Sequence, residues 1–182
     1  MGLAHDVGKT IGKAMTPLRA GEAGLASQKL GVLGRRTLDV TSPSFTDGGS
    51  LPRELTADGA GVPPRITWAN PPEGTRSFVL IAEDPDAPAP KPFVHWLVYG
   101  IPATSSSISG PQPLEGKNTM RKEGFTPAAP PAGHGIHQYH FQLFALDTPI
   151  DLERGAGRGE LLERMRDHIL AWGEIVGTYE RS

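Results

Sequence analysis

The sequence predicts a mainly β protein built as an antiparallel sandwich. Several short runs carry strand signatures, and segments rich in Pro and Gly separate them where regular helical patterns would otherwise stand. Such spacing disfavours βαβ units with a parallel sheet. The 182 residues suit a single core, and 23 Gly with 18 Pro residues predict many turns within a folded chain.

The strongest strand predictions come from three apolar runs. Ser77–Asp84 and Phe93–Gly100 are nearly continuous in apolar residues, as expected for central strands that are buried on both faces. Ile136–Asp147 is long, rich in aromatic residues and alternating. Thr37–Phe45 and Arg65–Trp68 are shorter extended segments that fit the rest of a sandwich.

One amphipathic helix is predicted near the C-terminus, over Gly159–Trp172. Its apolar residues recur at helical spacing and form one stripe: Leu161, Leu162, Met165, Ile169 and Trp172. Glu160 and Arg164 add a favourable pair one turn apart.

The first 36 residues differ from the rest and predict an N-terminal helical extension to a β domain at 37–182. Apolar residues recur every three or four positions, at Leu3, Val7, Ile11, Met15 and Leu18. This period predicts a helix over residues 3–18 that packs through its apolar face. We expect that face to lie on its own domain or on a partner subunit, so a homodimer is one expectation; a helix on a membrane surface is the weaker alternative.

Composition and charge exclude several classes of function. A net charge of −2 provides no strong attraction to nucleic acid or anionic lipid. The absence of cysteine excludes disulfides, thiolate catalysis and zinc sites built on cysteine. No apolar run approaches the roughly 20 residues that span a bilayer, and glycines and lysines interrupt any signal-peptide pattern. We therefore expect a cytoplasmic protein without a transmembrane segment.

Three polar clusters lie in or beside the predicted strands. Asp84 and Asp86 follow a buried strand, His95 lies inside another, and His137 and Tyr139 share one face of a third. Alternation places His95 on the same face as Phe93, Leu97 and Tyr99. Each cluster alone has an ordinary explanation, namely a polar turn, a core histidine or an edge-strand pair. Together, these side chains predict one shared pocket.

Other kinds of chemistry find less support in the same residues. His and Asp are typical metal ligands, but no His-Glu-x-x-His or His-x-His spacing occurs. A hydrolase would need a nucleophile, and Ser105, Ser106 and Ser107 lie in a loop without the G-x-S-x-G pattern. We expect neither a metal nor a cofactor.

The order and spacing of these motifs resemble the phosphatidylethanolamine-binding protein family. The resemblance is closest to its bacterial Raf-kinase-inhibitor-like branch and covers about residues 37–182. It is carried by the run Asp84-Pro-Asp-Ala-Pro88, then Phe93-Val-His-Trp96, Gly116-x-Asn118, Pro130-Pro131, Gly135-Ile-His-Gln-Tyr139 and the C-terminal Gly177-Thr-Tyr-Glu-Arg181.

The resemblance implies a fold and a ligand pocket. The implied fold is a Greek-key β-sandwich with a large central sheet, a small second sheet and a few helices. The implied pocket accepts phosphate, phosphoethanolamine or similar small anionic head groups, and its lining by position is Asp84, Asp86, Pro88, His95, Pro131, His137, Tyr139 and Tyr179. A cis peptide between Ala87 and Pro88 is also implied.

The sequence departs from the family pattern at two places. Gln138 stands where the family usually has Arg, and Ala128-Ala129 precedes the two prolines where bacterial relatives often have Pro-Cys. The first change removes a permanent cation from an acidic cluster.

The expected function is non-catalytic binding or regulation. Carboxylates favour the protonated form of neighbouring imidazoles, so we expect His95 and His137 to be partly cationic and to donate to phosphate oxygens. This arrangement suits a zwitterionic phospho-amine ligand. The resemblance adds a kinase or protease as a protein partner that is inhibited. The alternative is a hydrolase that uses His95 or His137 as general base on a small phosphate or ester substrate.

Overall fold

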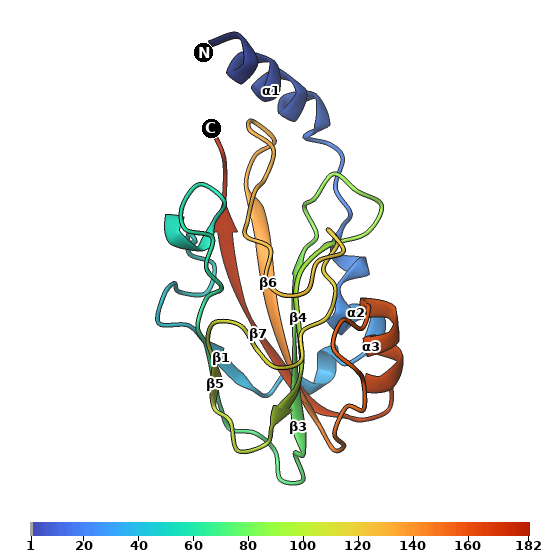
Figure 1. Ribbon diagram of the computed structural model, residues 1–182. Coiled ribbons are helices and arrows are strands. Elements are labelled where there is room, and N and C mark those ends of the chain that lie inside the picture. The colour runs from blue at the N-terminus through green and yellow to red at the C-terminus, as the bar shows by residue number, and fades with distance from the viewer. Residues whose placement is uncertain (1) are drawn as a thin grey trace.

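The computed structural model describes residues 2–182, with side chains described from residue 6 onward. Its strands form two antiparallel sheets, which confirms the predicted mainly β sandwich with one larger and one smaller sheet (Figure 1). The larger sheet has the order β4-β3-β6-β7 and contains β3 (Ser77–Asp84), β4 (Phe93–Pro102), β6 (His137–Leu146) and β7 (Ile169–Tyr179). The smaller sheet has the order β1-β2-β5 and contains β1 (Asp39–Thr41), β2 (Ile66–Ala69) and β5 (Ser107–Ile108).

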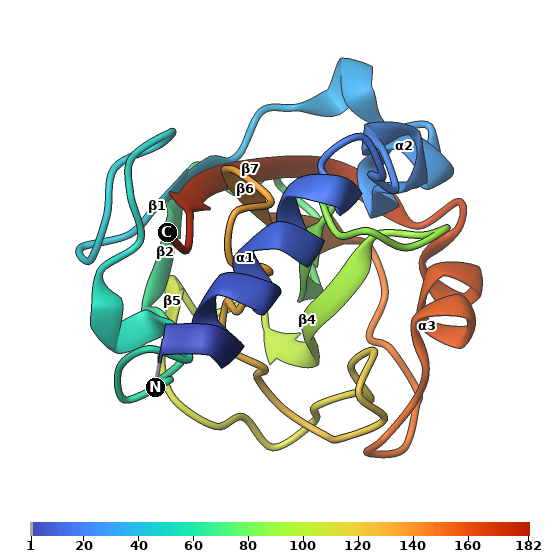
Figure 2. The ribbon, with the colours of Figure 1, turned by 90° about the horizontal axis from the view of Figure 1, so that it is seen from above.

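Helices cover one face and one end of the larger sheet. The α-helices are α1 (Gly2–Met15), α2 (Ala26–Leu30) and α3 (Arg158–Met165), and short 3-10 turns occupy Glu22–Gly24, Leu33–Arg35 and Arg53–Leu55. Seen from above, the small sheet lies on one side of the larger sheet, α2 and α3 lie on the other, and α1 crosses over the top (Figure 2). No helix in the part of the chain that is described is long and apolar enough to cross a bilayer.

Strand β3 is buried along its whole length, as its sequence predicted, because both of its faces are covered. Phe78 and Leu80 join the core between the two sheets. Val79 and Ile81 join a second core between the larger sheet and the helices α2 and α3. The near-continuous apolar run is the sequence signature of this three-layer packing.

The predicted helix at Gly159–Trp172 is correct only in its first half. Helix α3 ends at Met165, Asp167 adopts a left-handed backbone with φ 66°, and β7 begins at Ile169. The register between β6 and β7 shifts near Leu146 and Ile169. That irregularity puts Ile169 and Trp172 on the same side of the strand, toward the helices. The three-residue spacing of Ile169 and Trp172, which resembles a helical pattern, therefore comes from an irregular strand. The segment forms a strand because it pairs with β6 along the full length of β7.

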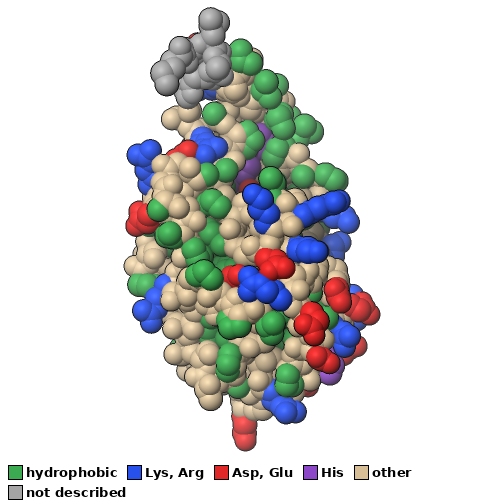
Figure 3. All heavy atoms as spheres, viewed as in Figure 1, with side chains coloured by type: hydrophobic (Ala, Val, Ile, Leu, Met, Phe, Trp, Pro, Cys, Tyr) green, Lys and Arg blue, Asp and Glu red, His purple; other side chains and the backbone are tan. Residues whose placement is uncertain are grey.

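Helix α1 forms over most of the predicted range but ends at Met15, before Leu18, and the face that packs on the domain is the opposite one. Val7, Ile11 and Leu18 are each more than half exposed, whereas Gly12 is buried. Hydrophobic side chains accordingly show on the outer side of α1 in Figure 3. The prediction that the apolar stripe packs on its own domain is wrong, because a close backbone approach at Gly12 fixes the helix instead. The side chain of Leu3 lies outside the described residues, and packing on a partner subunit stays a prediction.

A buried carboxylate ties the segment after α1 to the sheet. Glu83, which is fully buried, accepts hydrogen bonds from the backbone N–H of Ala26 (2.8 Å) and from Gln142 Nε2 (2.8 Å), and it forms an ion pair with Arg158. Arg158 also donates to the Gly24 carbonyl at 2.6 Å. These bonds hold residues 24–26 against the larger sheet, which places the end of α1 above the end of β3.

Candidate functional site

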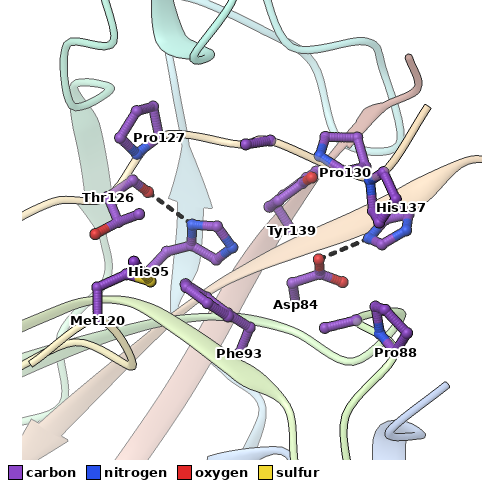
Figure 4. Close-up of a pocket in the computed structure, with 13 residues that line it drawn as sticks. Asp84, Pro88, Phe93, His95, Met120, Thr126, Pro127, Pro130, His137 and Tyr139 are labelled. Carbon is purple, nitrogen blue, oxygen red and sulfur yellow. Dashed lines mark hydrogen bonds and ion pairs between the residues drawn. The ribbon is translucent and has the colours of Figure 1, made fainter. Parts of the chain in front are cut away.

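A cavity of about 340 Å³ opens at the end of the sandwich that α1 crosses. This volume lies within the usual range for small-molecule pockets. Its lining includes six of the eight residues predicted from the sequence: Asp84, Pro88, His95, Pro131, His137 and Tyr139 (Figure 4). The rest of the lining comes from Ala87, Phe93, Met120, Thr126, Pro127, Ala129 and Pro130. Asp86 and Tyr179 lie outside the lining.

His95 enters the cavity because of a bulge in β4. The register of β3 with β4 pairs Ala82 with Trp96 but Glu83 with Val94, so one extra residue is accommodated at His95. Its ring consequently faces Tyr139, with centroids 5.2 Å apart. The prediction from simple alternation, which placed His95 on the face of Leu97, is wrong for this reason. Bulges often re-aim a side chain beside a functional site.

The His95 ring has a fixed tautomer. Its Nδ1 lies 2.6 Å from the carbonyl oxygen of Thr126, which can only accept, so Nδ1 carries the hydrogen. The other nitrogen, Nε2, points toward the centre of the cavity (Figure 4). Burial lowers the pKa of His95, and this outweighs the Thr126 hydrogen bond and the charge of Asp84, which act in the opposite direction. The expectation of a cationic His95 is therefore wrong, and at neutral pH Nε2 offers a lone pair.

Asp84 and two histidines form a hydrogen-bonded relay beside the cavity. His137 Nδ1 lies 2.7 Å from Asp84 Oδ2, and His137 Nε2 lies 2.6 Å from His134 Nδ1. His134 Nε2 lies 2.8 Å from the carbonyl oxygen of Met15, at the end of α1. All three side chains are buried. The relay thus runs from the wall of the cavity to the N-terminal helix.

Asp86 holds the strand β6 and the N-terminal segment together. Its Oδ2 accepts from the backbone N–H of Gln138 at 2.7 Å, and its Oδ1 lies 2.5 Å from Arg19 Nη1. Arg19 also donates to the carbonyl of Ile136 at 3.1 Å. The sequence places Gln138 where the resemblance implies Arg, and here a cation from the N-terminal segment reaches the same acidic cluster.

Tyr139 lies in the cavity wall between His95 and His137 (Figure 4). Its hydroxyl is buried and has no hydrogen-bond partner among the described residues. Burial, followed by the negative charge of Asp84, raises the pKa of the Tyr139 phenol, so the group stays protonated. A buried donor without a partner is rare, since leaving it unsatisfied costs about 1–3 kcal/mol.

Tyr179 lies outside the lining of this cavity, although it pairs with His137 across β6 and β7. Its hydroxyl donates to Asp58 Oδ2 at 2.8 Å, and Arg181 binds both oxygens of the same carboxylate at 2.8 and 2.7 Å. The Arg181 and Tyr179 hydrogen bonds lower the pKa of Asp58. This cluster anchors the C-terminal end of β7.

The loop before β6 is ordered by Asn118. Its Oδ1 accepts from the backbone N–H groups of Met120 (2.9 Å) and Lys122 (3.2 Å), and its Nδ2 donates to the Gly124 carbonyl (3.0 Å). These bonds bring Met120 to the cavity. The motif residue Asn118 is therefore a loop organiser that does not itself line the cavity.

The peptide between Ala87 and Pro88 is trans, because the described residues contain no cis bond, and the predicted cis peptide is wrong. The Ala87 carbonyl accepts from the backbone N–H groups of Ala20 (3.0 Å) and Ala89 (2.8 Å), which fixes the direction of this carbonyl.

The chemistry available here is recognition through hydrogen bonds. The cavity presents acceptors at Asp84 and His95 Nε2 beside aromatic and proline surfaces, and Tyr139 in its wall carries a buried hydroxyl without a partner among the described residues. Among residues with described side chains, no cluster of three or more His, Asp and Glu side chains has the arrangement of a metal site. Sequence reasoning missed the roles of His134, Arg19 and Met15. His134 had a weak signal in its spacing from His137, while Arg19 and Met15 had none.

The family profile described as phosphatidylethanolamine-binding protein matches residues 41–180. The chain belongs to the phosphatidylethanolamine-binding protein family. It is 39 % identical over 162 residues to a UPF0098 protein of Aquifex aeolicus, an alignment that covers 84 % of this chain and 94 % of that protein.

Two solved structures of the family have the same fold. A putative phosphatidylethanolamine-binding protein homologue from Chlamydia trachomatis matches with a TM-score of 0.75 and 32 % identity, over 81 % of this chain and 99 % of that one. The Escherichia coli protein YbcL matches with a TM-score of 0.75 and 30 % identity, over 80 % of this chain and 99 % of that one. The segment that contains Met15 and Arg19 lies before the residues matched by the family profile.

Proposed function

We propose that this family member is a binding protein whose cavity takes a small phospho-amine head group, with phosphoethanolamine chemistry. The observation that carries the proposal is the coexistence, in one cavity, of two acceptors and one unpartnered donor. Asp84 and His95 Nε2 accept, and the Tyr139 hydroxyl donates. A ligand with an ammonium at one end and a phosphate at the other satisfies both kinds of group.

The two ends of the ligand are assigned by hydrogen-bond direction. The ammonium lies beside Asp84 and the lone pair of His95, where the rings of Phe93 and Tyr139 add a favourable face for a cation. A phosphate oxygen accepts from the Tyr139 hydroxyl, which removes the cost of its missing partner.

Neutralised carboxylates make the site tolerant of a phosphate. Arg19 forms an ion pair with Asp86, and His137 binds Asp84. The expected repulsion between phosphate and two carboxylates is therefore offset by groups that the fold itself provides.

Isothermal titration with four ligands tests the proposal. Glycerophosphoethanolamine should bind with a Kd on the order of 0.1–1 mM, because so small a ligand has few contacts to offset the entropy of association. Glycerophosphate and ethanolamine each lack one end and should bind at least several-fold more weakly, as should inorganic phosphate. Equal affinity for glycerophosphate and glycerophosphoethanolamine would contradict the assignment of the ammonium to Asp84 and His95.

A hydrolase is the second candidate, and one observation favours it. The Thr126 carbonyl fixes His95 with Nε2 unprotonated and facing the cavity, which is the orientation of a general base. His137 is unsuited to this role because both of its ring nitrogens are engaged. Turnover of p-nitrophenyl phosphate or p-nitrophenyl acetate that is abolished by His95→Gln would favour the hydrolase.

A further inference from the structure

The relay beside the cavity has a definite hydrogen count. Its three bonds use all four ring nitrogens of His134 and His137. The Met15 carbonyl can only accept, and so can Asp84 when it is ionised, so His134 Nε2 and His137 Nδ1 each carry a hydrogen. The bond between the two rings needs a third hydrogen. Two neutral imidazoles carry only two, so the group of Asp84, His137 and His134 together holds one additional proton.

That proton cancels the charge of Asp84. With one positive charge shared by the two rings, the group of Asp84, His137 and His134 has a net charge of zero. Arg19 does the same for Asp86. Both neutralising contacts depend on the N-terminal segment, since Met15 and Arg19 come from it.

Helix α1 contacts the domain closely through its backbone at Gly12. A Cβ added to Gly12 would lie 1.8 Å from the Ala132 carbonyl oxygen and 3.1 Å from the backbone nitrogen of His134. Gly133 lies directly against Lys9 and Lys13 of the same helix. Only a glycine at position 12 therefore lets Met15 approach His134. Because the carbonyls at the C-terminal end of a helix carry partial negative charge, Met15 favours a cationic ring.

We propose that the N-terminal helix α1 is a working part of the head-group cavity, holding the shared proton of His134 and His137 through the Met15 carbonyl. His134 and Met15 are thus positioning groups that act through His137. This inference rests on the proposed function, because the neutralised Asp84 matters for a ligand that carries a phosphate. Displacing α1 returns a negative charge to the cavity wall and weakens phosphate binding.

Gly12→Ala tests the proposal, and Gly8→Ala is its matched control. Both substitutions make the same chemical change in the same helix and favour helix formation equally. A Cβ at Gly8 meets nothing within 4 Å, whereas a Cβ at Gly12 meets the backbone of Ala132. Hydrogen exchange reports whether α1 is docked, and calorimetry with glycerophosphoethanolamine from pH 6 to 9 reports binding.

We expect Gly12→Ala to lose protection of α1 and to bind roughly tenfold more weakly, a change of about 1.4 kcal/mol. The pH dependence of probe binding should change as well, because the Met15 carbonyl no longer accepts from His134. Gly8→Ala should match the native protein in both measurements. Undocking of α1 with unchanged affinity and pH profile would overturn the proposal.

His134→Asn tests the relay independently of the helix contact. It should weaken binding of glycerophosphoethanolamine and change its pH dependence as Gly12→Ala does, and circular dichroism checks that the variant is folded. An unchanged pH profile in this folded variant would also overturn the proposal. The other charged or titratable groups around the pair are Asp84 at the end of β3, Asp86 beyond it, His95 in β4, Tyr139 in β6, Tyr179 in β7, Lys9, Lys13 and Arg19 in the N-terminal segment, and Arg181. These groups keep their places in Gly8→Ala and in a folded His134→Asn. Undocking of α1 in Gly12→Ala would also move Lys9, Lys13 and Arg19, so His134→Asn is the variant that isolates the relay.

A second readout separates this inference from the proposed function. Nitrogen-15 spectra of the histidine rings count their hydrogens without any ligand. Three N–H hydrogens on His134 and His137 in the native protein and in Gly8→Ala, but not in Gly12→Ala, support the relay even if the native protein binds no probe. Binding by the native protein together with two neutral rings would sink the relay and leave the binding function standing.

Discussion

Arg19 Nη1 lies 2.5 Å from Asp86 Oδ1, so a residue of the N-terminal segment neutralises a carboxylate beside the cavity. The family resemblance implies an arginine at position 138, where this chain has Gln. Gln138 keeps only its backbone N–H on Asp86. Arg19, which precedes the residues matched by the family profile, therefore supplies the cation that the motif lacks. This ion pair holds the N-terminal extension close to the site.

Whether an arginine at position 138 can replace Arg19 is testable. Arg19→Gln should weaken glycerophosphoethanolamine binding several-fold, because Asp86 then adds an uncompensated negative charge. Gln138→Arg in the same protein should restore part of the affinity. Arg36→Gln, which breaks an ion pair with Glu174 on another surface, is the control and should leave the calorimetric Kd unchanged. A failure of Gln138→Arg to restore binding would contradict this account.

Tyr139→Phe should separate binding from stability. The substitution removes a buried hydroxyl that has no protein partner, so the free energy of unfolding should stay the same or rise by up to about 1 kcal/mol. Affinity for glycerophosphoethanolamine should fall several-fold, because the donor to phosphate is lost.

Tyr99→Phe is the matched control for Tyr139→Phe. The Tyr99 hydroxyl donates to the Glu153 carbonyl at 2.5 Å and accepts from the Ala156 N–H at 3.1 Å. Its removal should cost about 1–2 kcal/mol of stability and leave binding unchanged. Denaturant unfolding and calorimetry on both variants check the two opposite patterns, and a destabilised Tyr139→Phe with native affinity would refute the assignment.

The lowered pKa of His95 predicts a loss of stability in weak acid. The unfolded imidazole takes up a proton near its ordinary value of about 6.5, whereas the folded one does so only at lower pH. Protonation therefore favours the unfolded state as pH falls below about 6.5, and the loss levels off below the folded pKa. Urea titrations between pH 8 and 4.5 should show a smaller decrease in His95→Gln than in the native protein. Parallel curves for the two proteins would contradict a buried neutral His95.

The ion pair of Glu83 and Arg158 should matter far more than a surface pair of the same kind. Glu83 is fully buried, so Arg158→Met leaves a buried carboxylate without its cation and should cost about 3 kcal/mol. Arg166 and Glu163 are exposed at 3.7 Å, and Arg166→Met should cost less than about 1 kcal/mol. Thermal unfolding of both variants gives the comparison, and equal shifts in Tm would show that Glu83 is compensated by its other hydrogen bonds.

The sequence by itself determined the class of fold and six of the thirteen residues that line the cavity. Ser77–Asp84 could be read as a central strand because burial on both faces demands a continuous apolar run. Asp84, His137 and Tyr139 could be placed together because they lie at strand ends and alternate on one face.

Tertiary structure decided what local patterns cannot encode. The pairing of β4 with β3 and of β7 with β6 sets the register of these strands. It produces the bulge at His95 and the irregular start of β7, so face assignments based on simple periodicity are wrong there. The outward apolar face of α1 follows from one close backbone contact at Gly12. Arg19 and Met15 contact residues of the site that lie more than 60 positions away in the sequence. The sequence around Arg19 and Met15 contains no pattern that predicts these contacts.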